Sequence, residues 1–411
     1  MNRVILHSDL NSYFASVECM KNPELKKYPV AVCGNTEERC GIVLAKNNIA
    51  KQYNIITGES VCSALSKCHN LVVVSPHYDE YVKYSQLTRR IYDRYTDRIE
   101  PFGIDECWLD VTESIKLFGS GEQIANDIRK AVFAELGLTV SVGVSFTKSF
   151  SKIGSDIKKP NAVTCFPYES FKTDVWNLPV NMLIGVGYST IKKLFILGIK
   201  TIGDLANYPQ EALTNKLGKC GLMLWLCANG LDMSPVQKKD YHTPIKSIGH
   251  SSTTICDLDN EEDALNVISE LCDNIGYRLR NARLCAYGIC VGVRDNSLEV
   301  KEFQQKQMLP IRSTRDIAFA AKNIFKSNYS WNKNIRSVSI RVFSLVPYDI
   351  PTQLDMFSDT EKINRHEKID DVIDSIREKY GKQMVYTATH LKELKIPKDK
   401  ATEKIPCFMY L

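Results

Sequence analysis

The sequence predicts a multidomain α+β protein whose first domain is built on a split β-α-β sheet. Two observations support this fold class. The apolar residues on both sides of Gly103-Ile104 alternate, which is typical of two strands joined by a tight turn. Around this hairpin, the patterns follow one another as strand, insertion, helix, hairpin, helix, strand. In such a sheet the first strand lies next to the hairpin.

The individual elements can be assigned in chain order from their periodicity. Short apolar stretches predict strands at 4–9, 29–33, 41–45, 99–111 and 139–144. Amphipathic stretches predict helices at 11–18, 46–51, 78–95, 123–135 and 148–159, the last one stopped by Pro160. A second α+β unit is predicted at 242–347, with its clearest strands at 287–294 and 335–342, and a further helix at 365–380.

Two adjacent carboxylates, Asp105 and Glu106, lie where the predicted turn opens into its second strand. Like charges side by side raise each other's pKa, and a divalent cation relieves that repulsion. Hard Mg²⁺ prefers oxygen ligands of this kind. A solvated turn is the alternative, because Gly-x-Asp-Glu is common in turns. Asp9 ends the first predicted strand, so the predicted sheet would bring it beside the pair.

Composition limits the class of protein. A chain of 411 residues allows about two to four domains, and its apolar content of 44% excludes a wholly disordered protein. There is no apolar run that could span a bilayer and no signal peptide pattern. The 14 cysteines form no Cys-x-x-Cys pair, which suggests neither a zinc site nor a disulfide framework. We therefore expect a cytoplasmic protein without a membrane partner.

Several basic or glycine-rich stretches suggest a polyanionic partner, which the net charge of +5 favours only weakly. Lys46 and Lys51 flank a predicted helix start, and 148–161 contains four Lys against one Asp. Residues 184–194 and 198–205 have the pattern of a helix-hairpin-helix unit, whose glycines let the backbone approach a DNA phosphate. Solvated lysine faces and a plain glycine loop are the alternatives.

Together these stretches resemble the Y-family (translesion) DNA polymerases of the bacterial polymerase IV type. The most specific parts are Asp9–Phe14, Ile104–Glu106 with Leu109–Val111, and Lys152–Asn161, and the resemblance extends from residue 1 to about 357. It implies an error-prone, lesion-bypass DNA polymerase in DNA repair, with primer-template DNA and deoxynucleoside triphosphates as substrates. It also implies a right-hand polymerase with a ferredoxin-like palm (1–15 and 76–165), small fingers (16–75), a helical helix-hairpin-helix thumb (166–241), an α+β little finger (242–347) and a tail (348–411).

The resemblance also implies roles for individual residues. Asp9, Asp105 and Glu106, with the Leu10 carbonyl, would hold two Mg²⁺ ions, and Phe14 would be the steric gate that excludes a 2′-hydroxyl. The implied triphosphate contacts are Ser12, Tyr13, Lys51 and Lys159. The implied DNA contacts are Lys152, Gly185, Gly187, Arg336 and Arg341. Asp110 matches no ligand position and is interpreted as structural.

The chain departs from the family pattern in the fingers. Asn48 stands where many relatives have a tyrosine, and Lys51 stands for their usual arginine. Lys51 keeps the charge but loses the bidentate fork of an arginine. Lys46 could compensate for this loss.

After the little finger, Gln353–Phe357 resembles the short peptide by which bacterial polymerases bind the sliding clamp, the β subunit. In that peptide Gln353 would enter a polar pocket, and Leu354, Met356 and Phe357 an apolar one. Apart from this partner we expect a monomer.

Two other functions are compatible with parts of the pattern. A diguanylate-type cyclase shares the ferredoxin-like palm, but it carries Gly-Gly-Asp/Glu-Glu-Phe at the hairpin, where this chain has Phe102–Cys107. A non-catalytic scaffold that binds DNA and the clamp would be favoured by an incomplete set of acidic residues, and here all three are present.

Overall fold

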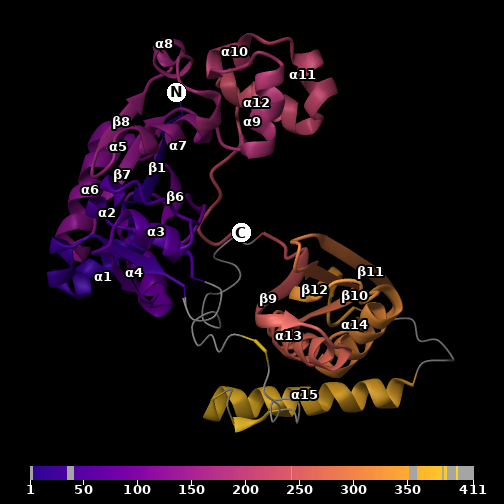
Figure 1. Cartoon of the computed structure of the whole chain (residues 1–411). Coiled ribbons are helices and arrows are strands. Elements are labelled where there is room, and N and C mark those ends of the chain that lie inside the picture. Colours follow the sequence, from indigo (N-terminus) through magenta and orange to yellow (C-terminus); the bar gives the residue numbers. More distant parts are fainter. Residues whose placement is uncertain are drawn as a thin grey trace. The chain divides into compact units, whose positions relative to one another are not determined.

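The computed structural model describes residues 3–34, 41–241, 243–350, 359–381, 384–386 and 395–396 (Figure 1). The chain forms two compact units that meet in sequence at Thr243 and Pro244. Within the described residues, no helix is long and apolar enough to cross a membrane. The predicted clamp-binding segment, Gln353–Phe357, lies outside the described residues.

The first unit contains a five-stranded sheet with the strand order β5-β6-β1-β7-β8. Its strands are β1 (Ile5–Leu10), β5 (Ile99–Pro101), β6 (Glu106–Asp110), β7 (Val140–Ser145) and β8 (Val163–Phe166). The first strand, β1, lies between β6 and β7 and is antiparallel to both, with Asp9 opposite Glu106. This confirms the split β-α-β arrangement predicted from the sequence.

Helices cover the two faces of this sheet, and the alternation along β1 decides which side chain meets which helix. On one face, Leu6 joins a core that includes Ile91 and Ile128, from α4 (Tyr78–Tyr92) and α6 (Gly121–Leu136). On the other face, His7 meets Ser155 of α7 (Lys148–Ile157). Asp9 is two residues beyond His7, so its side chain lies on the same side as α7.

A small three-stranded sheet of order β3-β2-β4 follows helix α1 (Tyr13–Lys21). Its elements are β2 (Val30–Cys33), β3 (Val43–Lys46) and β4 (Val72–Val74), with α2 (Asn48–Gln52) and α3 (Val61–Lys67). Side chains from both strands and helices form its core, among them Val43, Ala50 and Val61. The side chain of Asn47 accepts a hydrogen bond from the Ala50 N–H, which fixes the start of α2 just after β3.

A group of short helices follows β8. Its members are α8 (Phe171–Val175), α9 (Tyr188–Ile196), α10 (Ile202–Asn207), α11 (Gln210–Leu217) and α12 (Lys219–Ala228). Phe150 of α7 belongs to the same buried cluster as Leu194, Leu205 and Leu224. This cluster anchors the helical group to the helix that also carries Lys152.

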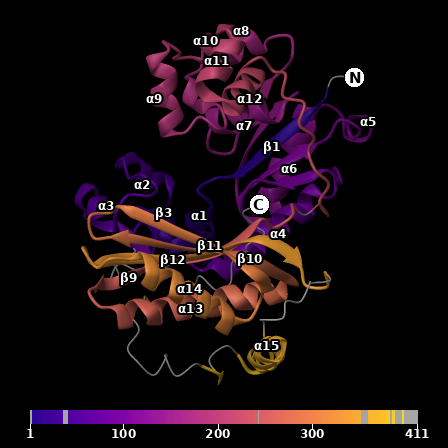
Figure 2. The same ribbon diagram turned by 90° about the vertical axis from the view of Figure 1, so that its right-hand side faces the viewer.

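The second unit is a four-stranded antiparallel sheet of order β11-β10-β12-β9. Its strands are β9 (Ser247–Leu258), β10 (Leu284–Asp295), β11 (Val300–Ile311) and β12 (Ile335–Pro347). Helices α13 (Glu261–Asn281) and α14 (Thr314–Asn328) cover one face, as Figure 2 shows. The alternation predicted two of these strands, β10 and β12, whereas β9 and β11 are too polar to show an apolar face.

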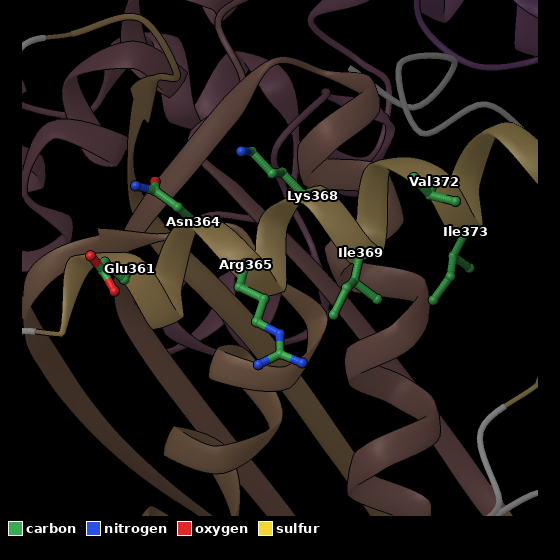
Figure 3. A pocket seen from close by; sticks show the side chains of 7 residues that line it. All are labelled: Glu361, Asn364, Arg365, Lys368, Ile369, Val372 and Ile373. Carbon is green, nitrogen blue, oxygen red and sulfur yellow. The ribbon is translucent and has the colours of Figure 1, made fainter.

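Helix α15 (Thr360–Tyr380) is attached to the second unit mainly by ion pairs. The Arg280 guanidinium lies 2.6 Å from Asp374 and 3.3 Å from Asp370, and Arg377 lies 2.9 Å from Asp273. Other residues of α15 line a separate pocket, which includes Lys368 and Val372 (Figure 3). The helix predicted at 365–380 is present, and it starts five residues earlier, at Thr360.

Candidate active site at the ends of the central strands

Three carboxylates meet where β1 ends beside the start of β6. Asp9 pairs directly with Glu106 across the two strands, and the Leu10 N–H donates to the Asp105 carbonyl at 3.1 Å. The hairpin turn places Asp105 next to Glu106, and the sheet order adds Asp9 from a strand almost a hundred residues away in sequence. The structure thus brings together the three acidic residues that the sequence singled out.

Two lysines face these acids: Lys152 from the middle of α7, and Lys159 from just beyond its end. Lys152 Nζ lies 2.8 Å from Glu106 Oε1 and 3.6 Å from Asp9 Oδ2. Lys159 Nζ lies 2.7 Å from Asp9 Oδ2, and both ammonium groups are also close to Asp156, at 3.5 and 2.8 Å. Lys152, predicted as a DNA contact, is therefore part of the charge cluster itself.

Burial and mutual repulsion set the protonation of the acids. Burial, and then the charges of Asp9 and Glu106, raise the pKa of Asp105 to about 7. Burial also raises the pKa of Asp9, although Lys159 opposes this shift. For Glu106, burial acts in the same direction, but the nearby His7 and Lys152 outweigh it and lower the pKa to about 2. Lys152 and Lys159 contact Glu106 and Asp9, so the repulsion between the three carboxylates raises the pKa of Asp105 most clearly.

This donor set fits a hard divalent cation. All three side chains offer carboxylate oxygens, and a cation would relieve the repulsion that raises the pKa of Asp105. Among the described residues, no group of three His, Cys, Asp or Glu side chains is arranged as a ready-made metal site. Ammonium groups contact carboxylate oxygens of Glu106 and Asp9. The backbone of Leu10, the predicted fourth ligand, ends β1 beside these acids.

Next to the acids, the start of α1 carries the predicted nucleotide contacts. Ser12 has a left-handed backbone with φ of 49°, and its buried Oγ has no hydrogen-bond partner. The Tyr13 ring is buried, and its hydroxyl donates to the Tyr81 carbonyl. Phe14 is partly exposed and stacks on the Tyr81 ring, with centroids 4.1 Å apart and planes 9° apart. The side chain of Tyr13 is therefore occupied, and its predicted triphosphate contact would have to come from its backbone.

Three lysines, Lys46, Lys51 and Lys159, lie close enough to one another for their charges to interact. Burial, and then the charges of Lys46 and Lys159, lower the pKa of Lys51. The Lys51 ammonium donates to Asn48 Oδ1 at 3.2 Å, and that of Lys46 donates to Thr57 Oγ1 at 3.0 Å. Like charges gathered in this way favour an anionic ligand.

The predicted DNA contacts lie on two other surfaces. Gly185 has φ of +87°, a conformation that favours glycine, and Gly187 caps α9; both are exposed. In the second unit, Arg341 lies between buried Ile340 and Val342 on β12, so its side chain is on the face away from the core. Arg336 is half-buried at the irregular start of the same strand.

Sequence reasoning missed several residues of the site. His7 is fully buried, with Nδ1 2.8 Å from Ser155 Oγ and Nε2 3.5 Å from Glu106 Oε2. Burial lowers the pKa of His7 to about 4. Asp156 and Tyr81 were also not singled out. The only signal in the sequence was that His7 precedes Asp9 by two residues and so shares its face of the strand.

Most of the chain is similar to known DNA polymerases and to family models that describe them. Residues 8–156 match the impB/mucB/samB family, residues 245–356 match the C-terminal domain of that family, and residues 181–232 match a thumb domain described from DNA polymerase-iota. DNA polymerase IV of Acetivibrio thermocellus is 49% identical over 93% of this chain and 96% of the relative. DNA polymerase IV of Clostridium acetobutylicum is 37% identical over 96% of this chain and 99% of the relative.

The fold is similar to that of a solved chimeric Y-family DNA polymerase. The TM-score is 0.75 at 22% sequence identity, and the match covers 84% of this chain and 99% of the other.

Proposed function

The chain belongs to the impB/mucB/samB family of Y-family DNA polymerases, and we propose that Asp9, Asp105 and Glu106 form its polymerase site. It is a DNA-directed DNA polymerase of the lesion-bypass type, with a DNA template, nucleotide substrates and a dependence on divalent metal. The single observation that carries the site is the meeting of three carboxylates, the buried Asp9 and the half-buried Asp105 and Glu106, where β1 ends beside the start of β6.

The proposed cofactor is a pair of Mg²⁺ ions held by Asp9, Asp105, Glu106 and the Leu10 carbonyl. When bound, divalent ions at such a site lower the pKa of the attacking primer 3′-hydroxyl and stabilise charge on the leaving pyrophosphate. The chain's own part is to keep the ligands ionised and oriented. Lys152 and Lys159 do this for Glu106 and Asp9 through contacts of 2.8 and 2.7 Å.

The proposed triphosphate site consists of the Ser12 hydroxyl, the backbone of Tyr13 and the ammonium groups of Lys51 and Lys159. Support comes from the unpartnered, buried Oγ of Ser12 and from the mutual repulsion of the lysines. Lys46 belongs to the same group of charges, and it supplies a third cation where Asn48 and Lys51 replace the usual tyrosine and arginine. A triphosphate would neutralise all three ammonium groups at once.

The proposed steric gate is Phe14. Its stacking on Tyr81 fixes the plane of the ring, and Tyr81 is itself held by a hydrogen bond of 2.5 Å from its hydroxyl to Glu18. A ring supported in this way resists displacement by a ribose 2′-hydroxyl better than a free side chain would.

DNA would be held by contacts to its phosphate backbone, which do not depend on the base sequence. The exposed glycines Gly185 and Gly187 can donate backbone N–H groups to a phosphate, and Lys152, Arg336 and Arg341 supply positive charge.

The proposed clamp contact, Gln353–Phe357, rests on its sequence pattern and its position after β12. A loaded clamp should stimulate synthesis by the wild type on a long primed template. We expect Leu354→Ala with Phe357→Ala to abolish this stimulation, so that the ratio of synthesis with and without the clamp falls to about one. An unchanged ratio would remove this segment from the clamp interface. We further propose a cytoplasmic monomer.

Primer extension over a range of Mg²⁺ concentrations tests the site. We expect Asp105→Asn to abolish extension while primer-template affinity, measured by fluorescence anisotropy, stays within about twofold of wild type, because most of the proposed DNA contacts lie outside the acidic cluster. Asp110→Asn is the matched control and should leave extension intact. Asp110 ends β6, the strand that begins just after Asp105, and its carboxylate accepts a hydrogen bond from the Thr112 hydroxyl at 2.6 Å. Substantial extension by the Asp105 variant would refute the assignment.

A further inference from the structure

His7 is a fully buried imidazole directly beneath the acidic cluster. It lies on β1 two residues before Asp9 and directly opposite Trp108 on β6. Nδ1 lies 2.8 Å from Ser155 Oγ, while Nε2 is buried, has no hydrogen-bond partner and lies 3.5 Å from Glu106 Oε2. Buried polar atoms are usually paired, so an orphaned nitrogen aimed at a carboxylate needs an explanation.

The Ser155 hydroxyl decides which nitrogen of a neutral His7 carries the proton. Ser155 Oγ also lies 2.8 Å from the Lys152 carbonyl, but a hydroxyl has one proton to donate. If Ser155 donates to that carbonyl, Nδ1 of His7 must carry the hydrogen, and a bare Nε2 lone pair faces a carboxylate oxygen. If Ser155 donates to Nδ1, the hydrogen lies on Nε2 and points at Glu106.

The structure records the Ser155 hydroxyl donating to the Lys152 carbonyl, so the second arrangement gives up that hydrogen bond. It is still favoured, because the Lys152 carbonyl lies inside α7, where a backbone N–H can satisfy it, whereas a bare Nε2 facing a carboxylate is an uncompensated buried repulsion. A charged imidazolium would also donate from Nε2, so the same contact follows in either protonation state. The Trp108 ring meets the His7 ring edge-on, with centroids 5.3 Å apart and planes at 64°, which restricts rotation of the imidazole.

We propose that His7, set by Ser155, is a positioning residue for Glu106: it holds Oε2 so that Oε1 faces Asp9 and the proposed metal site. The two oxygens of Glu106 already face different groups, because Oε1 lies 2.8 Å from Lys152 and Oε2 faces His7. Hydrogen bonds to the outer oxygen of a metal-binding carboxylate fix its rotamer and raise metal affinity. This inference rests on the proposed role of Asp9, Asp105 and Glu106.

A pair of substitutions separates the two nitrogens of His7. His7→Gln places an amide near the position of Nε2 and keeps a donor toward Glu106, whereas His7→Asn places one near Nδ1 and keeps only the contact with Ser155. We expect the Asn variant to bind Mn²⁺ about tenfold more weakly than wild type, and the Gln variant less than about threefold more weakly. The measurement is a titration of the full chain with Mn²⁺ alone, in which free Mn²⁺ is read by electron paramagnetic resonance.

Controls make each outcome decisive. Asp105→Asn should lose the Mn²⁺ site; if it does not, the proposed polymerase site fails, whatever His7 does. If Asp105→Asn loses the site but the Asn and Gln variants of His7 bind Mn²⁺ equally well, the positioning role is wrong. Ser155→Ala, a smaller change on α7, should weaken Mn²⁺ binding without removing the imidazole, and wild-type affinity in that variant would also overturn the proposal. Melting temperatures without metal identify any variant that has merely lost its fold.

Discussion

The two units use their sheets in opposite ways. In the first, charged side chains gather at buried strand ends: the Asp9 side chain is 8% exposed and that of Lys152 15%. In the second, Arg341 and Glu302 lie on the open face of the sheet and are paired at 3.4 Å, with side chains 42% and 58% exposed. Both sheets are covered by helices on the side of their apolar core.

The difference shows how burial changes the meaning of a charge. Buried ions interact strongly and are costly to leave unpaired, so a cluster of acids persists only where partners such as Lys152 and Lys159 compensate it. Exposed ions are screened by salt and contribute little individually. The first arrangement suits a reaction that needs fixed geometry, and the second suits reversible contact with a long polyanion.

The strongest test exchanges one acid in each sheet for its neutral amide. We expect Glu106→Gln to lower the rate of primer extension at least about a thousandfold, because several kcal/mol of transition-state stabilisation are lost and each 1.36 kcal/mol is tenfold. Glu302→Gln, the matched change on the exposed sheet, should alter the rate less than about twofold. Comparable losses in both variants would break the distinction between the sheets.

A smaller effect is expected at the proposed steric gate, where packing rather than charge decides. Phe14→Ala removes the ring that stacks on Tyr81, and we expect the preference for deoxyribonucleotides over ribonucleotides to fall about 10- to 100-fold. The ratio of kcat/KM for the two nucleotides measures this preference. Phe14→Leu keeps much of the side-chain volume, so its preference for deoxyribonucleotides should lie between those of the wild type and Phe14→Ala. An unchanged ratio in a folded Ala variant would refute the assignment.

The smallest effect is expected on the open sheet. Arg341→Ala and Arg336→Ala should each weaken primer-template binding modestly and lower the slope of log affinity against log salt concentration by about 0.9. Lys326→Ala is the control, because Lys326 lies on α14, where it pairs with Glu261 at 2.8 Å. An arginine variant that keeps the full slope would show that this residue does not contact DNA.

The sequence alone predicted much of the first unit, for a local reason. Alternation around Gly103-Ile104 and along residues 4–9 encodes which face of each strand is buried, and the order of the elements then predicts that Asp9 adjoins Asp105 and Glu106. The second unit was less readable. The exposed positions of β9 and β11 carry polar residues, which leave no clear alternation.

Other features were decided by the tertiary structure. Lys152 appeared in the sequence as one of several basic residues, and only the packing of α7 on the sheet turns it toward Glu106. The same packing brings Ser155 to His7, and the docking of α4 brings Tyr81 under Phe14. The periodicity of a segment indicates which of its faces is buried. It does not indicate which side chain packs against that face, because that side chain comes from an element distant in sequence. Its identity depends on how helices and strands pack in three dimensions, which no local pattern contains.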